Sequence, residues 1–300
     1  MNERHDRLLP LLLDIEEDLD QDLSLGALAS RFGSSEFHFH RQFRAAVGET
    51  PKQHVERLRL EKAALQLAVS DTPITELAFA LGFQNLETFS RRFKTAVGHS
   101  PSEYRRLARA AQAERVHIRN FHDSSDYFLS RARFGTLPDM HLLALRQLGD
   151  YGKLNASFGE ADSAWTEVQE LATAAGLVGN TPVFVGFFLD DPTMTPEAQR
   201  RADVCVVLQR QAAPVAAARY IHVAGGLHAS ADYIGDSFHL LHAYQGLADE
   251  IRRSPRYRFR ESTALLFPRS AQVDGRRGVH AYEVCFPVQR ISPQESSNVA

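Results

Sequence analysis

Apolar and polar residues alternate along the first third of the chain with the spacing of amphipathic helices. Between residues 74 and 81 the apolar positions are Ile74, Leu77, Ala78 and Leu81. This i, i+3, i+4, i+7 spacing is typical of a helix that buries one face. The pair Thr72-Pro73 predicts its start, because proline suits the first helical position. Gly82 predicts its end, because a tight turn needs a residue that accepts positive φ.

A second helix is expected directly after this turn. Asn85 is a good N-cap, and Gly98 would end the helix. Its inner stripe would be Phe89, Phe93 and Val97, and its outward positions Leu86, Glu87, Ser90 and Arg91. A helix, a tight turn and a second helix with an exposed face form a helix-turn-helix, which presents the second helix to the DNA major groove.

The same pattern occurs about fifty residues earlier. Phe39, Arg41, Phe43, Arg44, Ala46, Val47, Gly48 and Pro51 recur as Phe89, Arg91, Phe93, Lys94, Ala96, Val97, Gly98 and Pro101. The preceding helix would be capped by Ser24, and the first reading helix would start at Ser34 or Ser35. A doubled pattern is far more specific for DNA binding than one helix pair.

Both copies lead into a further helix through the same sequence device. Thr50-Pro51-Lys52-Gln53 and Ser100-Pro101-Ser102-Glu103 are capping boxes with proline at the first helical position. The helix from Pro51 to about Val69 should hold the two units at a fixed spacing. Two rigidly joined units can read successive major-groove segments, about 34–36 Å apart, on one side of DNA.

The residues from about Leu8 to Arg106 resemble the DNA-binding domain of AraC-type transcription regulators. The GF-x5-FSRRFK-x3-G-x-SP-x-EYR signature stands here as Gly82-Phe83, Phe89 to Lys94, Gly98, Ser100-Pro101 and Glu103-Tyr104-Arg105. The resemblance covers about a third of the chain. It implies an all-α domain with two helix-turn-helix units and double-stranded DNA as a partner.

Geometry and the family pattern together nominate the residues that would contact DNA. The base-contact candidates are Phe37, His40 and Arg41 in the first unit, and Leu86, Glu87 and Arg91 in the second. Arginine can donate two hydrogen bonds to guanine, glutamate can accept a hydrogen bond from the cytosine amino group, and an apolar side chain can contact a thymine methyl group. The phosphate-contact candidates, which position without specifying, are Arg44, Arg92 and Lys94. Any of these side chains could instead be a solvated surface group.

The second half of the chain changes from helical periodicity to alternating strands and helices. Strands are expected at 141–148, 183–189, 204–208, 217–223, 263–267 and 281–288, and helices at 158–171 and, mainly, 233–251. Asp203-Val204-Cys205 and Glu283-Val284-Cys285 occupy matching places 80 residues apart. We therefore predict an α+β domain of two pseudo-symmetric strand-helix-strand-strand repeats.

This half resembles the GyrI-like effector-binding domain that follows AraC-type readers in some multidrug-responsive regulators. The residues that carry the resemblance are Leu145 to Tyr151 and the stretch FFLDDPTMTPEAQRRADVCV, from Phe187 to Val206. In the family this domain is implied to bind amphipathic, often cationic ligands between aromatic walls, with a buried glutamate late in the domain.

The sequence departs from the family at that glutamate. The nearest acid is Glu261, but spacing counted back from Glu283 places Leu266 at the expected position. The charge preference of the pocket is therefore open. Candidate ligand-binding residues are Tyr151, Trp165, Phe187, Tyr244, Glu261 and Tyr282, and each aromatic one could equally be core or rim.

Charge and composition agree with two domains of different function. The chain has 300 residues and a net charge of −3. Residues 31–110 hold 13 Lys and Arg against 8 Asp and Glu, a net +5, which suits phosphate attraction. Two cysteines make no disulfide framework, and no apolar run approaches the roughly 20 residues of a membrane span, so a cytoplasmic protein is expected.

The organisation expected from the sequence is multidomain. Residues 1–110 would form the DNA-binding domain, 111–137 a linker, 138–292 the GyrI-like domain and 293–300 a tail. The leading hypothesis is a transcription regulator controlled by a small amphipathic molecule, with no catalytic activity, cofactor or metal. RNA polymerase is a candidate further partner.

Two alternatives concern the C-terminal domain. It could be a hydrolase of reactive ligands, with Glu261, Glu283 or Glu250 as the acid, or a ligand-free protein-docking module. The pair His239 and His242 has no nearby Cys or second ligand pair, so it predicts no metal site.

Overall fold

The computed structural model describes residues 3–115, 127–190, 195–236, 240–260, 264–270 and 279–291. The chain forms two compact units, Met1–Leu107 and Ala108–Ala300. None of the described helices is both long enough and apolar enough to cross a membrane.

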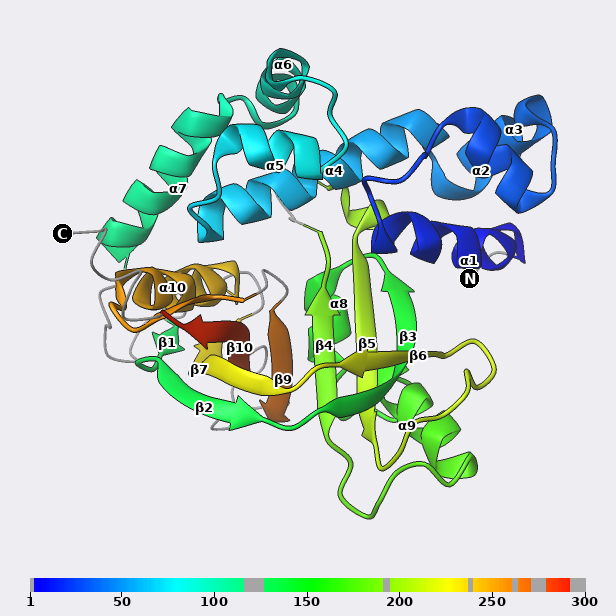
Figure 1. Ribbon diagram of the computed structural model, residues 1–300. Coiled ribbons are helices and arrows are strands. Elements are labelled where there is room, and N and C mark those ends of the chain that lie inside the picture. Colours follow the sequence, from blue (N-terminus) through cyan, green and yellow to red (C-terminus); the bar gives the residue numbers. More distant parts are fainter. Residues whose placement is uncertain are drawn as a thin grey trace. The chain divides into compact units, whose positions relative to one another are not determined.

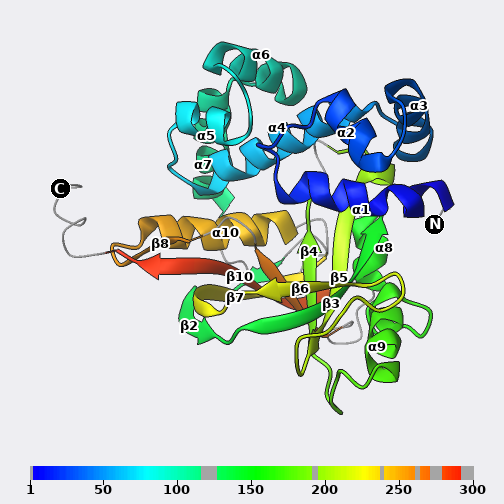
Figure 2. The same cartoon turned by 45° about the vertical axis from the view of Figure 1, so that its right-hand side comes forward.

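The first unit is all helical (Figure 1). Its helices are α1 (Glu3–Glu17), α2 (Leu25–Phe32), α3 (Glu36–Val47), α4 (Pro51–Val69), α5 (Ile74–Ala80), α6 (Leu86–Val97) and α7 (Pro101–Arg115). Helix α4 connects the α2–α3 pair to the α5–α6 pair, as Figures 1 and 2 show. The two predicted helix-turn-helix units are therefore confirmed.

Most of the predicted helix starts are also confirmed. The side chains of Ser24, Ser35 and Asn85 cap α2, α3 and α6, and Thr50 with Gln53 forms a complete capping box at α4. The prediction at Thr72-Pro73 was wrong in detail. Pro73 itself is the N-cap of α5, and it makes no side-chain cap because its ring has no hydrogen-bond acceptor. The Thr72 hydroxyl accepts a hydrogen bond from Ser70.

The core of the first unit repeats a chain of aromatic contacts. Phe32, Phe39, Phe43 and His54 follow one another with ring centroids 5.4–5.6 Å apart. Phe83, Phe89, Phe93 and Tyr104 do the same at 5.1–5.6 Å. Phe39, Phe43, Phe89 and Phe93 are fully buried, so they hold the helices together and are not available to stack on bases.

The second unit is α+β. Its strands are β1 (Phe128–Leu129), β2 (Arg133–Leu137), β3 (Met140–Leu148), β4 (Phe184–Phe188), β5 (Arg201–Leu208), β6 (Arg219–Val223), β7 (Gly226–Gly235), β8 (Tyr257–Phe259), β9 (Leu265–Ser270) and β10 (His280–Arg290). Its helices are α8 (Tyr151–Ala156), α9 (Ala164–Ala174), a short 3-10 turn η1 (Glu197–Gln199) and α10 (Leu240–Arg253). Eight of the strands form an antiparallel sheet in the order β1-β7-β10-β9-β4-β5-β3-β6 (Figure 1). Off this order, β2 pairs with β7 and β8 pairs with β10.

The register of the sheet confirms the predicted pseudo-symmetry. Phe187 pairs with Asp203 on β5, and Phe267, 80 residues later, pairs with Glu283 on β10. The two halves meet where β4 pairs with β9, and the paired residues are Gly186 and Leu266, again 80 apart. The pseudo-twofold axis therefore passes between these two residues.

One strand of the second repeat was missed. Residues 226–235 form strand β7, whereas the prediction placed a helix from residue 233 and took 217–223 as the first strand of the repeat. Residues 219–223 instead form β6, an edge strand beside β3. The inward positions of β7 include Ala229 and Ala231, and such small residues give little hydrophobic alternation.

The predicted linker also contains ordered structure. Strands β1 and β2 fall within residues 111–137, and both pair with β7. Helix α7 extends to Arg115. Residues 116–126 and the tail at 293–300 lie outside the described residues, so the domain limits remain a prediction.

The two faces of the sheet have different neighbours. Directly opposed residues share a face, so the paired residues Val204, Gly186, Leu266 and Val284 lie on one face. Trp165 of α9 packs over Gly186, and Tyr244 of α10 packs on Phe286, so both helices cover this side, here named the helix face. The opposite face holds an apolar cluster that includes Leu142, Val185, Phe187, Cys205, Leu265 and Cys285.

Candidate nucleic-acid interface and effector site

The caps fix where each reading helix begins and therefore which residues face outward. The Ser35 hydroxyl accepts a hydrogen bond from the His38 amide at 3.4 Å, and Asn85 Oδ1 accepts one from Thr88 at 2.8 Å. Both helices end in a left-handed glycine, Gly48 at φ 85° and Gly98 at φ 84°. The two reading helices thus have the same length and the same orientation of the inner phenylalanines.

The first reading helix exposes most of its predicted contact residues. Phe37 is 79% exposed, which is unusual for a phenylalanine and leaves its ring free to meet a thymine methyl group. Arg41 and Arg44 are exposed, and His40 is half-buried.

The second reading helix has the same arrangement. Leu86 is 37% exposed, and Glu87, Arg91 and Lys94 are exposed. Arg92 is exposed as well, but its Nη1 lies 3.3 Å from Oε1 of Glu56 on α4. Direct contact of any of these groups with DNA stays a prediction.

Arg59 ties the two helix-turn-helix units to the connecting helix, and sequence reasoning missed it. From α4 it donates to the Leu19 carbonyl through Nε (2.9 Å) and Nη2 (2.6 Å), and to the Gly82 carbonyl through Nη1 (3.3 Å). Burial lowers the pKa of Arg59 from its usual value. One side chain thus links the segment before α2 to the turn before α6. The sequence indicated this role only weakly, through an arginine side chain placed among the many apolar residues of the helix.

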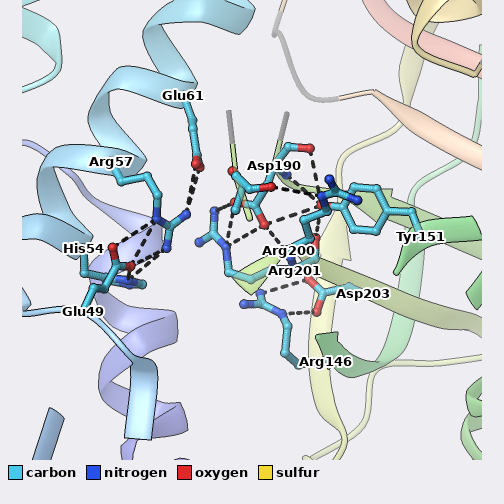
Figure 3. Close-up of polar contacts among 11 residues, drawn as sticks. Glu49, His54, Arg57, Glu61, Arg146, Tyr151, Asp190, Arg200, Arg201 and Asp203 are labelled. Carbon is cyan, nitrogen blue, oxygen red and sulfur yellow. Dashed lines mark hydrogen bonds and ion pairs between the residues drawn. The ribbon is translucent and has the colours of Figure 1, made fainter. Parts of the chain in front are cut away.

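A compact ionic cluster joins α3 to α4 in the first unit (Figure 3). Arg57 lies between Glu49 (Nη2–Oε1, 2.7 Å) and Glu61 (Nη1–Oε1, 3.0 Å), and His54 Nδ1 lies 2.8 Å from Glu49 Oε1. Burial raises the pKa of Glu49, but the hydrogen bonds from His54 and Arg57 outweigh it, and the net pKa is lowered. The cluster fixes the start of α4 relative to the end of α3.

In the second unit, residues of the GyrI-like motif take part in two ionic clusters, one around Asp203 and one around Asp190 (Figure 3). Arg146 Nε lies 2.8 Å from Asp203 Oδ1, and Arg219 Nη2 lies 2.6 Å from Asp203 Oδ2. Arg201 pairs with Asp190, bringing the end of β4 to the start of β5. These residues therefore organise the sheet rather than face a ligand.

Tyr151 belongs to the second of these contacts. Its hydroxyl donates to the Arg201 carbonyl at 2.8 Å, and its ring packs edge-on to Phe188 at 4.9 Å. Asp150 caps the short helix that begins with Tyr151. Within the stretch Leu145 to Tyr151, Asp150 thus supplies a helix cap.

Trp165, Tyr244 and Tyr282 lie on the helix face, Trp165 in the first repeat and the two tyrosines in the second, whereas Phe187 does not. Trp165 is buried and donates from Nε1 to the Leu154 carbonyl at 3.0 Å. Tyr282 stacks on Tyr233 with centroids 6.3 Å apart, and Tyr244 lies near it from α10. Phe187 alternates onto the opposite face, so it does not lie with Trp165. Glu261 lies outside the described residues.

Tyr282 carries a polar group that its surroundings do not satisfy. Its side chain is 2% exposed, and in the described part of the chain its hydroxyl has no hydrogen-bond partner. Burial raises the pKa of Tyr282 and of Tyr244, so both stay neutral. An unsatisfied buried hydroxyl is rare and calls for an explanation such as an absent water or ligand.

Of the three acids considered for hydrolysis, the two that the structure describes, Glu283 and Glu250, are engaged elsewhere. Glu283 alternates onto the face opposite Tyr282, where it pairs with Arg133 at 3.2 Å and with Arg269. Glu250 accepts a hydrogen bond from the Ala132 amide at 2.9 Å. Among the described residues no group of three or more His, Cys, Asp or Glu side chains could hold a metal ion.

Both cysteines are buried core residues. Cys205 and Cys285 are both free thiols within the apolar cluster on the sheet face opposite the helices. Burial raises the pKa of each thiol well above its usual value, so neither is a reactive thiolate.

Comparison with known proteins agrees with both halves. A helix-turn-helix domain model matches residues 28–107, and a model of a GyrI-like small molecule binding domain matches residues 132–289, just over half of the chain.

Two curated relatives match part of the chain. Regulatory protein SoxS of Salmonella typhimurium is 32% identical over 102 residues, which are 34% of this chain and 95% of SoxS. Transcriptional regulator Rob of the same organism is 31% identical over 137 residues, 46% of each chain. The match therefore spans nearly all of SoxS and about half of Rob. The solved DNA-binding domain of AdpA in complex with a target DNA is 29% identical over 36% of this chain and 96% of that chain, with a TM-score of 0.35.

Proposed function

This chain belongs to the AraC-type transcription regulators that carry a GyrI-like domain, and from that premise we propose that it reads its operator with both α3 and α6 under the control of a small molecule. The observation that carries the DNA-reading part is the pair of matched helices with exposed outer faces. Their caps, terminal glycines and inner phenylalanines correspond, and Arg59 fixes both units to α4.

The two helices would read different sequences. The first presents Phe37 and Arg41, and the second presents Leu86, Glu87 and Arg91. A guanidinium prefers guanine and a carboxylate prefers the cytosine amino group. An operator without palindromic symmetry therefore fits this chain best, with phosphates clamped by Arg44, Arg92 and Lys94.

The ligand would bind on the helix face of the C-terminal sheet. The support is the buried Tyr282 hydroxyl, which lacks a partner in the described residues, together with the neighbouring Tyr233 and Tyr244 rings. Leu266 occupies the centre of this face and is fully buried. An uncharged amphipathic ligand with one hydrogen-bonding group suits these side chains better than a cation does.

Regulation requires only that the ligand bind the DNA-competent and DNA-incompetent states with different affinity. RNA polymerase is the partner through which a bound activator would act. A regulator works in the compartment that holds its operator, so the cytoplasmic location belongs to this proposal. We assign the chain no catalytic role, because the relatives it matches are regulators. Chemical conversion of a bound ligand during long incubation would contradict that assignment.

The decisive test of base reading uses the double variant Arg41→Gln, Arg91→Gln. An operator is first selected from a random DNA pool, and its affinity is then compared with that of unrelated DNA. Each lost guanidinium–guanine contact should cost about 2 kcal/mol of operator binding and less of nonspecific binding.

The charge-matched control is Lys62→Gln, Arg210→Gln, which removes two positive charges that belong to neither α3 nor α6. It should leave the ratio of specific to nonspecific affinity unchanged. If the Arg41/Arg91 variant also keeps that ratio, the two arginines do not read bases.

A further inference from the structure

A groove in the DNA-binding unit lies between the connecting helix and the second reading helix. It has a volume of about 310 Å³ and is named here the α4–α6 groove. Its lining consists of Glu56, Leu60, Arg91, Arg92, Thr95 and Ala96. Leu60 is only 4% exposed, so the inner part of the groove is apolar, while the arginines stand at its rim.

The charges around the groove favour an anion. Arg92 is balanced by Glu56 at 3.3 Å. In the described part of the chain the guanidinium of Arg91 has neither an ion pair nor a hydrogen bond. The Thr95 hydroxyl is already used, since it donates to the Arg91 carbonyl at 2.9 Å. The groove thus offers one unused guanidinium, a net charge of +1 and an apolar floor.

The first helix-turn-helix unit lacks this chemistry at the equivalent positions. Fifty residues earlier, Gln42 stands for Arg92 and Ala45 for Thr95. Gln42 is uncharged and cannot form the ion pair that Arg92 makes, and its Nε2 lies 2.7 Å from His38 Nε2 on the same helix. Only Arg41 and Ala46 correspond to the groove residues Arg91 and Ala96. The groove therefore distinguishes the second unit from the first.

We propose that the α4–α6 groove is a second ligand site, which binds a small amphipathic carboxylate. The carboxylate accepts two hydrogen bonds from the Arg91 guanidinium, which is the geometry that arginine and carboxylate favour. The apolar part of the ligand lies against Leu60 and Ala96. This site is distinct from the GyrI-like domain, whose helix face is lined by neutral aromatic side chains.

Occupancy of the groove would oppose DNA binding. A carboxylate on Arg91 neutralises a side chain that the second reading helix needs for its base contact. By linkage, operator DNA and the carboxylate lower each other's affinity by the same factor. The groove thus gives the DNA-binding unit its own sensitivity to small anions.

The test uses the full chain with 4-phenylbutyrate as the probe and 4-phenylbutyramide as its uncharged counterpart. In 15N–1H correlation spectra the amide signals of Leu60, Thr95 and Ala96 should shift with the carboxylate. The amide probe should bind this groove about tenfold more weakly or worse, because it loses the charge-assisted hydrogen bonds. Signal shifts confined to the C-terminal unit would overturn the proposal.

Three variants locate the site. Arg91→Gln should lower the affinity of the groove for 4-phenylbutyrate, measured from these signal shifts, about tenfold. Arg41→Gln, the equivalent change in the first unit, should leave that affinity unchanged. Ala96→Leu places a larger side chain in the groove and should block the probe, while an exposed helical position tolerates leucine. Equal titration curves for the wild type and Arg91→Gln would refute the role of the guanidinium, whatever Ala96→Leu does.

Discussion

Single residues decide how firmly the two reading helices are held. Arg59 reaches two backbone carbonyls that are 63 residues apart in sequence, at Leu19 and Gly82. Gly82 has φ 73°, and a Cβ there would lie 2.5 Å from the Arg59 guanidinium, so the turn has room for the arginine only because it is glycine. The arginine and the glycine are thus a matched pair.

Replacing Arg59 by methionine should loosen the first unit. Two carbonyls lose charge-assisted hydrogen bonds while the apolar stem is kept, so the free energy of unfolding should fall by about 2 kcal/mol. Urea denaturation followed by circular dichroism measures this change. Lys62→Met, an exposed change on the same helix, should have almost no effect. An Arg59 variant as stable as the Lys62 variant would show that the tie is unimportant.

The ionic cluster around Glu49 predicts that the free energy of unfolding depends on pH. The pKa of Glu49 in the folded protein lies below the ordinary glutamate value of 4.5. Its contribution to stability is therefore fully present above pH 4.5 and is lost as the pH falls through the lower folded-state value. Unfolding free energies of the wild type should fall between about pH 5 and about pH 3 more steeply than those of Glu49→Gln. Parallel curves for the two proteins would contradict this.

At the scale of elements, the two central strands of the sheet, β4 and β9, carry side chains of different size where the pseudo-twofold axis passes between them. Gly186 and Leu266 are symmetry-related and directly paired, and they fill one shared space. A Cβ on Gly186 would lie 3.3 Å from both the Phe188 and the Trp165 rings and 3.8 Å from Leu266 Cβ. The two aromatic rings, rather than Leu266, therefore favour glycine at position 186.

Gly186→Ala should destabilise the C-terminal unit by about 1 kcal/mol, since the tight contacts force neighbouring rings to move. The matched control is Gly135→Ala on strand β2, where a Cβ meets no atom within 4 Å. That change should be neutral or slightly stabilising, because alanine costs less entropy than glycine in a strand. Thermal denaturation of the two variants decides the matter, and a Gly186 variant as stable as the Gly135 variant would show that the site is loosely packed.

At the scale of the whole molecule, the chain combines a unit that binds DNA with a unit whose helix face contains the Tyr282 hydroxyl, which has no hydrogen-bond partner among the described residues. A ligand that binds only the folded state raises the melting temperature in proportion to the logarithm of its concentration. A panel of amphipathic cations, neutral compounds and anions therefore reports the chemical class that the full chain recognises.

Tyr282→Phe should reduce the rise in melting temperature that the ligand causes, without lowering the stability of the protein in the absence of ligand. Without ligand the variant should be as stable as the wild type or more so, because a buried hydroxyl without a partner is removed. With a ligand that hydrogen-bonds to the hydroxyl, the increase in melting temperature should be smaller than in the wild type. Tyr233→Phe, which deletes a hydroxyl bonded to the Asp236 carbonyl, should instead lower stability without ligand. A Tyr282 variant with an undiminished ligand response would remove the hydroxyl from the site.

Local patterns in the sequence determined the DNA-binding unit almost completely. Its helices are bounded by caps and glycines such as Ser35, Asn85, Gly48 and Gly98, and these act on the backbone within three or four residues. The fifty-residue repeat then identified both reading helices, and the outward residues followed from the 3.6-residue period.

Tertiary structure alone decided the features that depend on distant partners. The role of Arg59, the pairing of β7 and the placement of Phe187 and Tyr282 on opposite faces follow from contacts between segments tens of residues apart. Strand β7 shows the reason clearly, because Ala229 and Ala231 are buried by their neighbours in the sheet rather than by their own hydrophobicity. Helix caps are local and can be read from a few residues, whereas strand register and the identity of a shared face exist only once the sheet has formed.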